Sequence, residues 1–147
     1  MKPESERCPL CGKERKREIS GSLNFCKNCR AVYNTDCRSL SYDRDYFINE
    51  YREQYGKTYL EDYGNIYHLS MTRLDTILEL LAVDGWLSLL DIGCAAGFFL
   101  KAAKDRGITT LLGIEISSYA AGYCRSTFGI DVIESPLTRL TYTRGSI

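Results

Sequence analysis

Several features that mark particular protein classes are scarce or missing in this sequence of 147 residues. No apolar run is long enough to span a bilayer, and residues 1–7 lack the apolar core of a signal peptide. Only one histidine is present, His68, and a lone histidine is more often a surface or packing residue than a catalytic base. We therefore expect a cytoplasmic protein without a membrane partner, whose cysteines are metal ligands or core residues rather than disulfides.

An excess of one charge is also missing, because 19 basic residues balance 19 acidic ones. The charges are unevenly placed: residues 1–41 carry nine basic and five acidic side chains, whereas residues 42–87 carry four and nine. A basic beginning before an acidic middle does not make a basic protein, so there is no strong signal for nucleic-acid binding. The length predicts a single domain, or a small module attached to part of another.

Four of the seven cysteines form two C-x-x-C pairs separated by fourteen residues, namely Cys8, Cys11, Cys26 and Cys29. Doubled pairs at this separation are typical of a tetrahedral four-thiolate zinc site, and incidental or redox cysteines would not explain the doubling. The polar spacer, with Ser20-Gly21-Ser22 as a turn, predicts a hairpin-like ribbon that a structural metal would stabilise. Cys37 is either a fifth candidate ligand or a small linker residue, and Arg30 stands where many ribbons carry glycine.

Tyrosine recurs every four residues from Tyr51 to Tyr67. On a helix this spacing places the rings along one slowly drifting stripe. Gly56 and Gly64 are expected to break the stripe into short helices, followed by a helix over residues 66–82, where apolar residues have helical spacing. The rings either pack against the domain that follows or line a cofactor or substrate pocket.

An apolar run over residues 86–90 ends at Asp91, and small residues then occupy positions 93, 95, 96 and 97 before a helical pattern begins. This pattern predicts a buried strand, a tight glycine turn and a helix that Gly107 closes. Small residues let the backbone approach a ligand, and a helix N-terminus offers free N–H groups. A dinucleotide motif would need its third glycine at Phe98, which disfavours a nicotinamide-dependent oxidoreductase.

Two further strands are expected, over residues 110–115 and 130–133. Between them Ser117 or Ser118 caps a helix whose buried face carries Ala120, Ala121, Cys124 and Phe128, and Gly129 stops it. The alternation β-α-β-α-β predicts a parallel sheet with right-handed crossovers. Glu115 ends the second strand, where an acid accepts hydrogen bonds from ribose hydroxyls in dinucleotide folds; alone, it would be a solvated acid at a strand end.

The segment Asp91-Ile92-Gly93-Cys94-Ala95-Ala96-Gly97 resembles motif I, D-x-G-x-G-x-G, of the class I S-adenosylmethionine-dependent methyltransferases, with Ala95 replacing one glycine. Residues 113–117 look like motif II of the same family. From Cys8 to about residue 137 the chain resembles bacterial class I methyltransferases with an N-terminal zinc ribbon. The resemblance includes the segment 42–47, Tyr-Asp-Arg-Asp-Tyr-Phe.

The resemblance implies an α/β, Rossmann-like parallel sheet. Its first β-α-β-α-β half would occupy residues 88–147, after a zinc ribbon at 1–41 and a Tyr-rich helical segment at 42–87. Zinc and S-adenosylmethionine would be the cofactors, with the turn at 93–97 facing the methionine part, Glu115 holding the ribose and Ile116 packing on the adenine. The implied cofactor-binding residues are Asp91, Gly93, Cys94, Ala95, Gly97, Glu115 and Ile116.

The family sheet is seven-stranded, in the order 3-2-1-4-5-7-6, and its fourth-strand motif is not found in residues 137–147. The sequence is therefore expected to be the first half of a methyltransferase, with little activity alone and with its acceptor and catalytic residues unassigned. The free edge of the first strand would favour self-association, unless residues 138–147 fold back onto it. The alternative is a zinc-ribbon binding or regulatory module with an incomplete Rossmann half and no catalysis.

Overall fold

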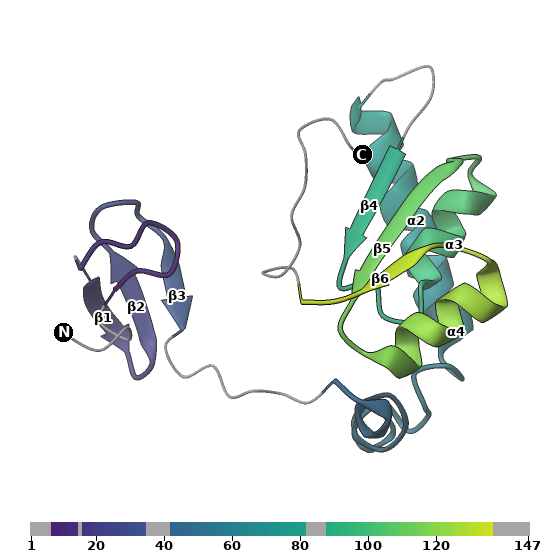
Figure 1. Cartoon of the computed structure of the whole chain (residues 1–147), viewed down its shortest axis with the longest axis horizontal. Helices are drawn as coiled ribbons and strands as arrows, with labels where there is room; N and C mark the ends of the chain where they lie inside the picture. The colour runs from purple at the N-terminus through teal and green to yellow at the C-terminus, as the bar shows by residue number, and fades with distance from the viewer. Residues whose placement is uncertain (1–6, 15, 35–41, 82–87, 137–147) are drawn as a thin grey trace. The chain divides into compact units, whose positions relative to one another are not determined.

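The computed structural model describes residues 7–14, 16–34, 42–81 and 88–136 (Figure 1). The chain divides into two units, Met1–Leu40 and Ser41–Ile147, and the Tyr-rich segment lies in the second. The expectations for Trp86, Cys37 and residues 138–147 fall outside the described residues. Within the described ranges, no helix has the length and apolar character needed to cross a membrane.

The first unit contains a small antiparallel sheet in the order β1-β2-β3. Its strands are β1 (Lys16–Ser20), β2 (Leu23–Cys26) and β3 (Val32–Asn34). The predicted turn joins β1 to β2, with Gly21 at a φ of 53° that suits glycine. Because side chains alternate along a strand, Asn24 and Cys26 share one face of β2, and both are buried.

The second unit begins with helical segments that carry the tyrosines. A π-helix, η2 (Tyr46–Glu50), leads into α1 (Tyr51–Tyr55), which ends at Gly56 in the left-handed conformation, as predicted. The prediction for Gly64 is wrong, because α2 (Tyr63–Leu81) runs through it without a break. A glycine costs a helix only about 1 kcal/mol relative to alanine, and the packing of α2 on the next helix outweighs that cost.

The parallel sheet of the second unit has the order β4-β5-β6, so the predicted β-α-β-α-β alternation is confirmed. Its strands are β4 (Ser88–Ile92), β5 (Thr110–Glu115) and β6 (Val132–Glu134). The connecting helices are α3 (Phe98–Asp105) and α4 (Ser118–Phe128). Ser117 caps α4, its Oγ accepting the N–H of Ala120 at 3.4 Å, and Gly129 ends that helix in the left-handed conformation.

Helices α2, α3 and α4 cover one face of this sheet (Figure 1). Leu89 of β4 and Leu111 of β5 contact both core clusters, one built on Leu100 and Cys124 and the other on Leu74. Paired residues of parallel strands point to the same face, and Leu89 pairs with Leu111. The same register aligns the ends of β4 and β5, which carry Asp91 and Glu115.

Candidate functional site

The turn between β4 and α3 is held by β5 and repeatedly adopts the left-handed conformation. The backbone N–H groups of Gly93 and Cys94 both donate to the carbonyl of Ile114, at 2.7 and 3.1 Å. Positive φ angles recur at alternate residues: 80° at Gly93, 48° at Ala95 and 78° at Gly97. A residue with a Cβ atom pays about 1–2 kcal/mol for this conformation, so the turn favours glycine and strains Ala95.

Glu115 joins this turn to the start of the next one. Its carboxylate is buried, with Oε2 accepting the N–H of Ala95 and Oε1 accepting the N–H of Ser117, each at 2.8 Å. A carboxylate has about four lone-pair positions, so two protein donors leave capacity for the hydroxyl donors of a ligand. Glu115 is therefore an anchor of the site and an available acceptor within it.

A cavity of 490 Å³ opens beside Glu115. Its floor combines Gly93, Ala95 and Glu115 with the apolar side chains that end or follow the strands, including Ile116. Ser135 after β6 and four aromatic residues also line the cavity; the aromatic residues are Tyr42, Tyr46, Phe47 and Tyr59. A cavity of this size, mostly apolar with a few polar groups, is typical of a small-molecule site.

A second cavity, of 580 Å³, lies between α2 and the end of β4. Asp91, Cys94 and Phe99 line it from one side and Arg73 of α2 from the other. Burial, followed by the negative charge of Glu115, raises the pKa of the Asp91 carboxyl. This cavity thus offers the carboxyl group of Asp91 and the guanidinium of Arg73 to a ligand that carries charges of both signs.

Two of the predicted site residues have roles in packing. Cys94 lines the second cavity, but its sulfur faces the core, where a Cβ added to Gly113 would lie 2.6 Å from it. Burial raises the pKa of the Cys94 thiol to about 12, so it stays protonated. Gly97 lines neither cavity, and a side chain there would overlap the sulfur of Cys124, so this glycine lets α4 approach the turn.

Some of the tyrosines pack against neighbouring elements, and others line the cavities. Tyr63 packs its ring against Phe98, with the centroids 5.0 Å apart, whereas the hydroxyl of Tyr67 bonds Asp105 at 2.7 Å. Tyr59 instead lines both cavities. The sequence signal for a tyrosine pocket was the four-residue spacing, and Phe47 belongs to the segment 42–47 that the resemblance included, but nothing in the sequence pointed to Arg73 or Ser135. His68 is exposed and lines neither cavity.

In the first unit, the structure brings the four predicted metal ligands together. The sulfurs of Cys8, Cys11, Cys26 and Cys29 all lie within 4.8 Å of one another. Those of Cys8 and Cys29 are 3.6 Å apart, as are those of Cys11 and Cys26, so the thiols are free. Tetrahedral zinc with Zn–S bonds of about 2.3 Å separates its sulfurs by about 3.8 Å, and the donor set fits that ion.

The two C-x-x-C turns have matching backbone geometry. Gly12 donates to the carbonyl of Cys8 at 2.9 Å, and Arg30 donates to that of Cys26 at 2.8 Å. Gly12 and Arg30 also share a positive φ, of 68° and 66°. Arg30 therefore occupies, with strain, the position at which many ribbons carry glycine.

The thiols lie too close together to be charged simultaneously without a cation. The backbone N–H of Lys13 lowers the pKa of Cys11 to about 6. The N–H of Ala31 favours the thiolate of Cys29, but burial and the neighbouring sulfurs prevail and raise its pKa to about 12. A divalent cation would relieve this conflict. It would also stabilise a unit in which Cys8 and Cys26 are the buried apolar residues among those described, since Leu10 and Val32 are exposed.

No family model and no curated protein matches the sequence. Among solved structures, the chain is similar to the plantazolicin methyltransferase BpumL in complex with a pentazolic desmethylPZN analog and SAH. The identity is 18% and the TM-score 0.47, over 65% of this chain and 35% of that one.

Two further solved structures have a comparable likeness. For a SAM dependent methyltransferase from Archaeoglobus fulgidus the identity is 24% and the TM-score 0.40, over 59% of this chain and 34% of that chain. For the magnesium protoporphyrin IX methyltransferase ChlM from Synechocystis PCC 6803 with bound SAH, the identity is 20% and the TM-score 0.41, over 67% of this chain and 52% of that chain. The chain thus spans 34–52% of the length of these structures.

Proposed function

We propose that the chain binds S-adenosylmethionine in the two cavities at the ends of β4 and β5, as the cofactor-binding part of a methyltransferase whose acceptor is unassigned. The central observation is the buried carboxylate of Glu115, which lines the first cavity while bonded to Ala95 in the glycine turn. The resemblance of residues 91–97 and 113–117 to motifs I and II supports the same assignment. When bound, S-adenosylmethionine would supply an electrophilic methyl group.

The charges and shapes of the two cavities suit the two halves of this ligand. In the first cavity, Glu115 has lone pairs free for ribose hydroxyls, and Ile116 lies among the apolar groups that would contact an adenine. In the second, Asp91 and Arg73 complement an ammonium and a carboxylate. A Cβ added to Gly93 would meet no protein atom within 4 Å, so the turn leaves room for a ligand.

Isothermal titration calorimetry with S-adenosylmethionine and, separately, NAD tests the proposal. We expect heat of binding with S-adenosylmethionine alone, abolished by Gly93→Val because the side chain fills the space that the ligand needs. Gly107→Val is the matched control, since Gly107 also has a positive φ, of 87°, a Cβ there also meets no atom within 4 Å, and Gly107 lines neither cavity. Binding of NAD alone would favour an oxidoreductase, and binding of neither would favour a non-catalytic ribbon module.

We also propose that the four clustered cysteines bind one structural zinc ion, in a ribbon spanning residues 1–41. The cluster supplies four thiolate donors and leaves no open coordination position, which is typical of a structural site. Reduced thiols suit a cytoplasmic location. Metal analysis should give about one zinc per chain, and Cys26→Ser should lower it and loosen the ribbon. A ribbon that folds fully without metal would refute this assignment.

A further inference from the structure

The two cavities share three lining residues, Tyr59, Gly93 and Ala95, which define a junction between them. In S-adenosylmethionine, the sulfur links the ribose to the amino-acid chain. If the function proposed above holds, with adenosine in one cavity and the amino acid in the other, the sulfur lies at this junction. The groups around the junction therefore determine which charge on sulfur is favoured.

Two carboxylates extend toward the junction from neighbouring strands. Asp91 pairs with Gly113 in the parallel register, and Glu115 follows Gly113 by two residues, so both acids point to the same face of the sheet. Asp91 lines one cavity and Glu115 the other. Arg73 is the one basic residue among the described lining residues of either cavity, and a ligand carboxylate would neutralise it.

Tyr59 adds a neutral hydroxyl to the two acids. Burial, followed by the negative charge of Asp91, raises the pKa of Tyr59 to about 12, so the phenol is protonated at neutral pH. No hydrogen bond joins its hydroxyl to another residue in the described part of the chain, so the oxygen lone pairs are available to a ligand. Its ring stacks on Phe98, with the centroids 5.2 Å apart, and its N–H donates to the carbonyl of Phe47.

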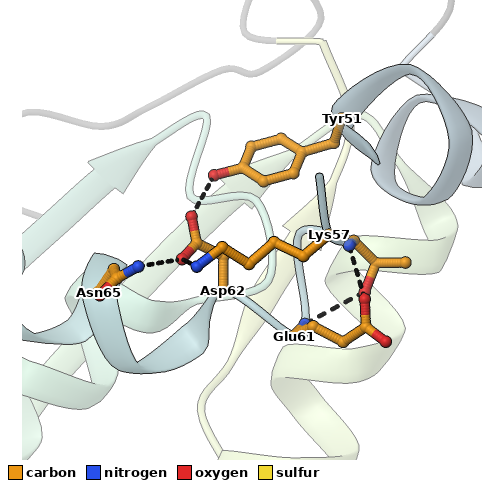
Figure 2. A network of polar contacts seen from close by, with 6 residues as sticks. Tyr51, Lys57, Glu61, Asp62 and Asn65 are labelled. Atoms are coloured by element: carbon orange, nitrogen blue, oxygen red, sulfur yellow. Dashed lines mark hydrogen bonds and ion pairs between the residues drawn. The ribbon is translucent and has the colours of Figure 1, made fainter. Parts of the chain in front are cut away.

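A buried polar network fixes the loop that carries Tyr59 (Figure 2). The carboxylate of Asp62 accepts hydrogen bonds from Tyr51 of α1 and Asn65 of α2, both at 2.7 Å, and pairs with Lys57 at 2.8 Å. Beside it, Glu61 accepts the N–H of Thr58 at 2.7 Å. The segment between α1 and α2 is thus bonded to both helices, which fixes the position of Tyr59 at the junction.

We propose that the junction is a cation site, at which Asp91, Glu115 and the hydroxyl oxygen of Tyr59 favour the sulfonium of S-adenosylmethionine over the neutral thioether of S-adenosylhomocysteine. In methyl transfer the electron pair of a nucleophilic acceptor forms the new bond to the methyl carbon. The S–CH₃ bonding pair returns to sulfur, which loses its positive charge. The same carboxylates that favour the cofactor then hold the product less tightly, which assists its release.

The test is calorimetric titration of the full chain with S-adenosylmethionine and with S-adenosylhomocysteine. Because a carboxylate a few ångströms from a cation attracts it even at an effective dielectric constant near 20, we expect wild type to bind S-adenosylmethionine about tenfold more tightly than S-adenosylhomocysteine. Asp91→Asn keeps the size of the side chain and should weaken both ligands, because both carry the ammonium that Asp91 would pair with. It should weaken S-adenosylmethionine more than S-adenosylhomocysteine and so remove most of the preference. Tyr59→Phe should reduce it by roughly threefold, the scale of a weak polar contact.

Two matched controls change the same chemical groups away from the cavities. Asp131→Asn alters an exposed acid before β6, and Tyr55→Phe alters an exposed tyrosine of α1; both should preserve the preference. Circular dichroism reports that each variant is folded. Equal affinity of wild type for the two ligands, or equal weakening of both by Asp91→Asn, would overturn the cation site while the proposed function stands. Binding of neither ligand by wild type would overturn the proposed function as well.

Discussion

The backbone N–H of Ala95 donates a 2.8 Å hydrogen bond to the carboxylate of Glu115, which joins the turn after β4 to the end of β5. One buried acid thereby fixes the two segments that resemble motifs I and II. It does so from the wall of a cavity in which it has lone pairs to spare. The same side chain therefore combines this structural role with the ligand-binding role that we propose for it.

Replacing Glu115 tests whether it contributes more to ligand binding than an ordinary acid at the end of a strand. We expect Glu115→Ala to weaken S-adenosylmethionine binding by about 1–3 kcal/mol, because hydroxyl and backbone donors lose their acceptor. Glu134 is the matched control: it pairs with Glu115 in the register of β5 and β6, is exposed and lines neither cavity. Calorimetry that finds equal affinity in Glu115→Ala and Glu134→Ala would contradict the role of Glu115.

The strain at Ala95 predicts that a glycine there stabilises the protein. Ala95→Gly removes the cost of a Cβ atom at a φ of 48°, offset in part by the greater freedom of glycine in the unfolded chain. We expect the free energy of unfolding to rise by about 0.5–1 kcal/mol in urea denaturation. Ala96→Gly, at a buried neighbour without a positive φ, should instead lower it. A loss of stability in both variants would argue against strain at Ala95.

The same argument applies to Arg30 in the ribbon. Arg30→Gly should stabilise the first unit by about 0.5–1 kcal/mol, because glycine adopts a φ of 66° without strain. Competition with a chelator should then require more chelator to remove zinc from the variant. Lys27→Gly, an exposed position without a positive φ, serves as the control and should not tighten zinc binding. Weaker zinc retention in Arg30→Gly would show that the arginine side chain itself supports the site.

The Asp62 network predicts a stability difference that depends on pH. Lys57, followed by Tyr51 and Asn65, lowers the pKa of Asp62 below its ordinary value of 3.8. The charged carboxylate therefore stabilises the folded state above pH 3.8, and this contribution is lost as the pH falls through the lowered pKa. At pH 7, Asp62→Asn should cost about 1–3 kcal/mol in urea denaturation, with the difference from wild type narrowing in acid.

A surface ion pair provides the comparison for Asp62. Asp75 pairs with Arg106 at 2.6 Å, but its side chain is 43% exposed. Asp75→Asn should therefore cost no more than about 1 kcal/mol at pH 7. A cost for Asp62→Asn no larger than this, or one that grows in acid, would contradict the stabilising role assigned to the network.

Local sequence patterns predicted much of the second unit, since each depends on neighbouring residues. The strand Thr110–Glu115, the Ser117 cap and the stop at Gly129 were all expected. The prediction that Gly64 breaks the helix was wrong, because the free-energy cost of one glycine is small beside the free energy gained when a 19-residue helix packs on its neighbours. The position of Arg73 in a cavity could not be predicted, because only tertiary packing brings α2 to the end of β4.

Amide NMR spectra of this 16.7 kDa chain, recorded as S-adenosylmethionine is added, test the central claim most directly. If the ligand binds at the ends of β4 and β5, the signals of Gly93, Ala95 and Ser117 move with saturation, while those of the ribbon residues Cys11 and Cys29 stay in place. Unmoved signals at Gly93, Ala95 and Ser117, or shifts confined to the ribbon, would contradict the account.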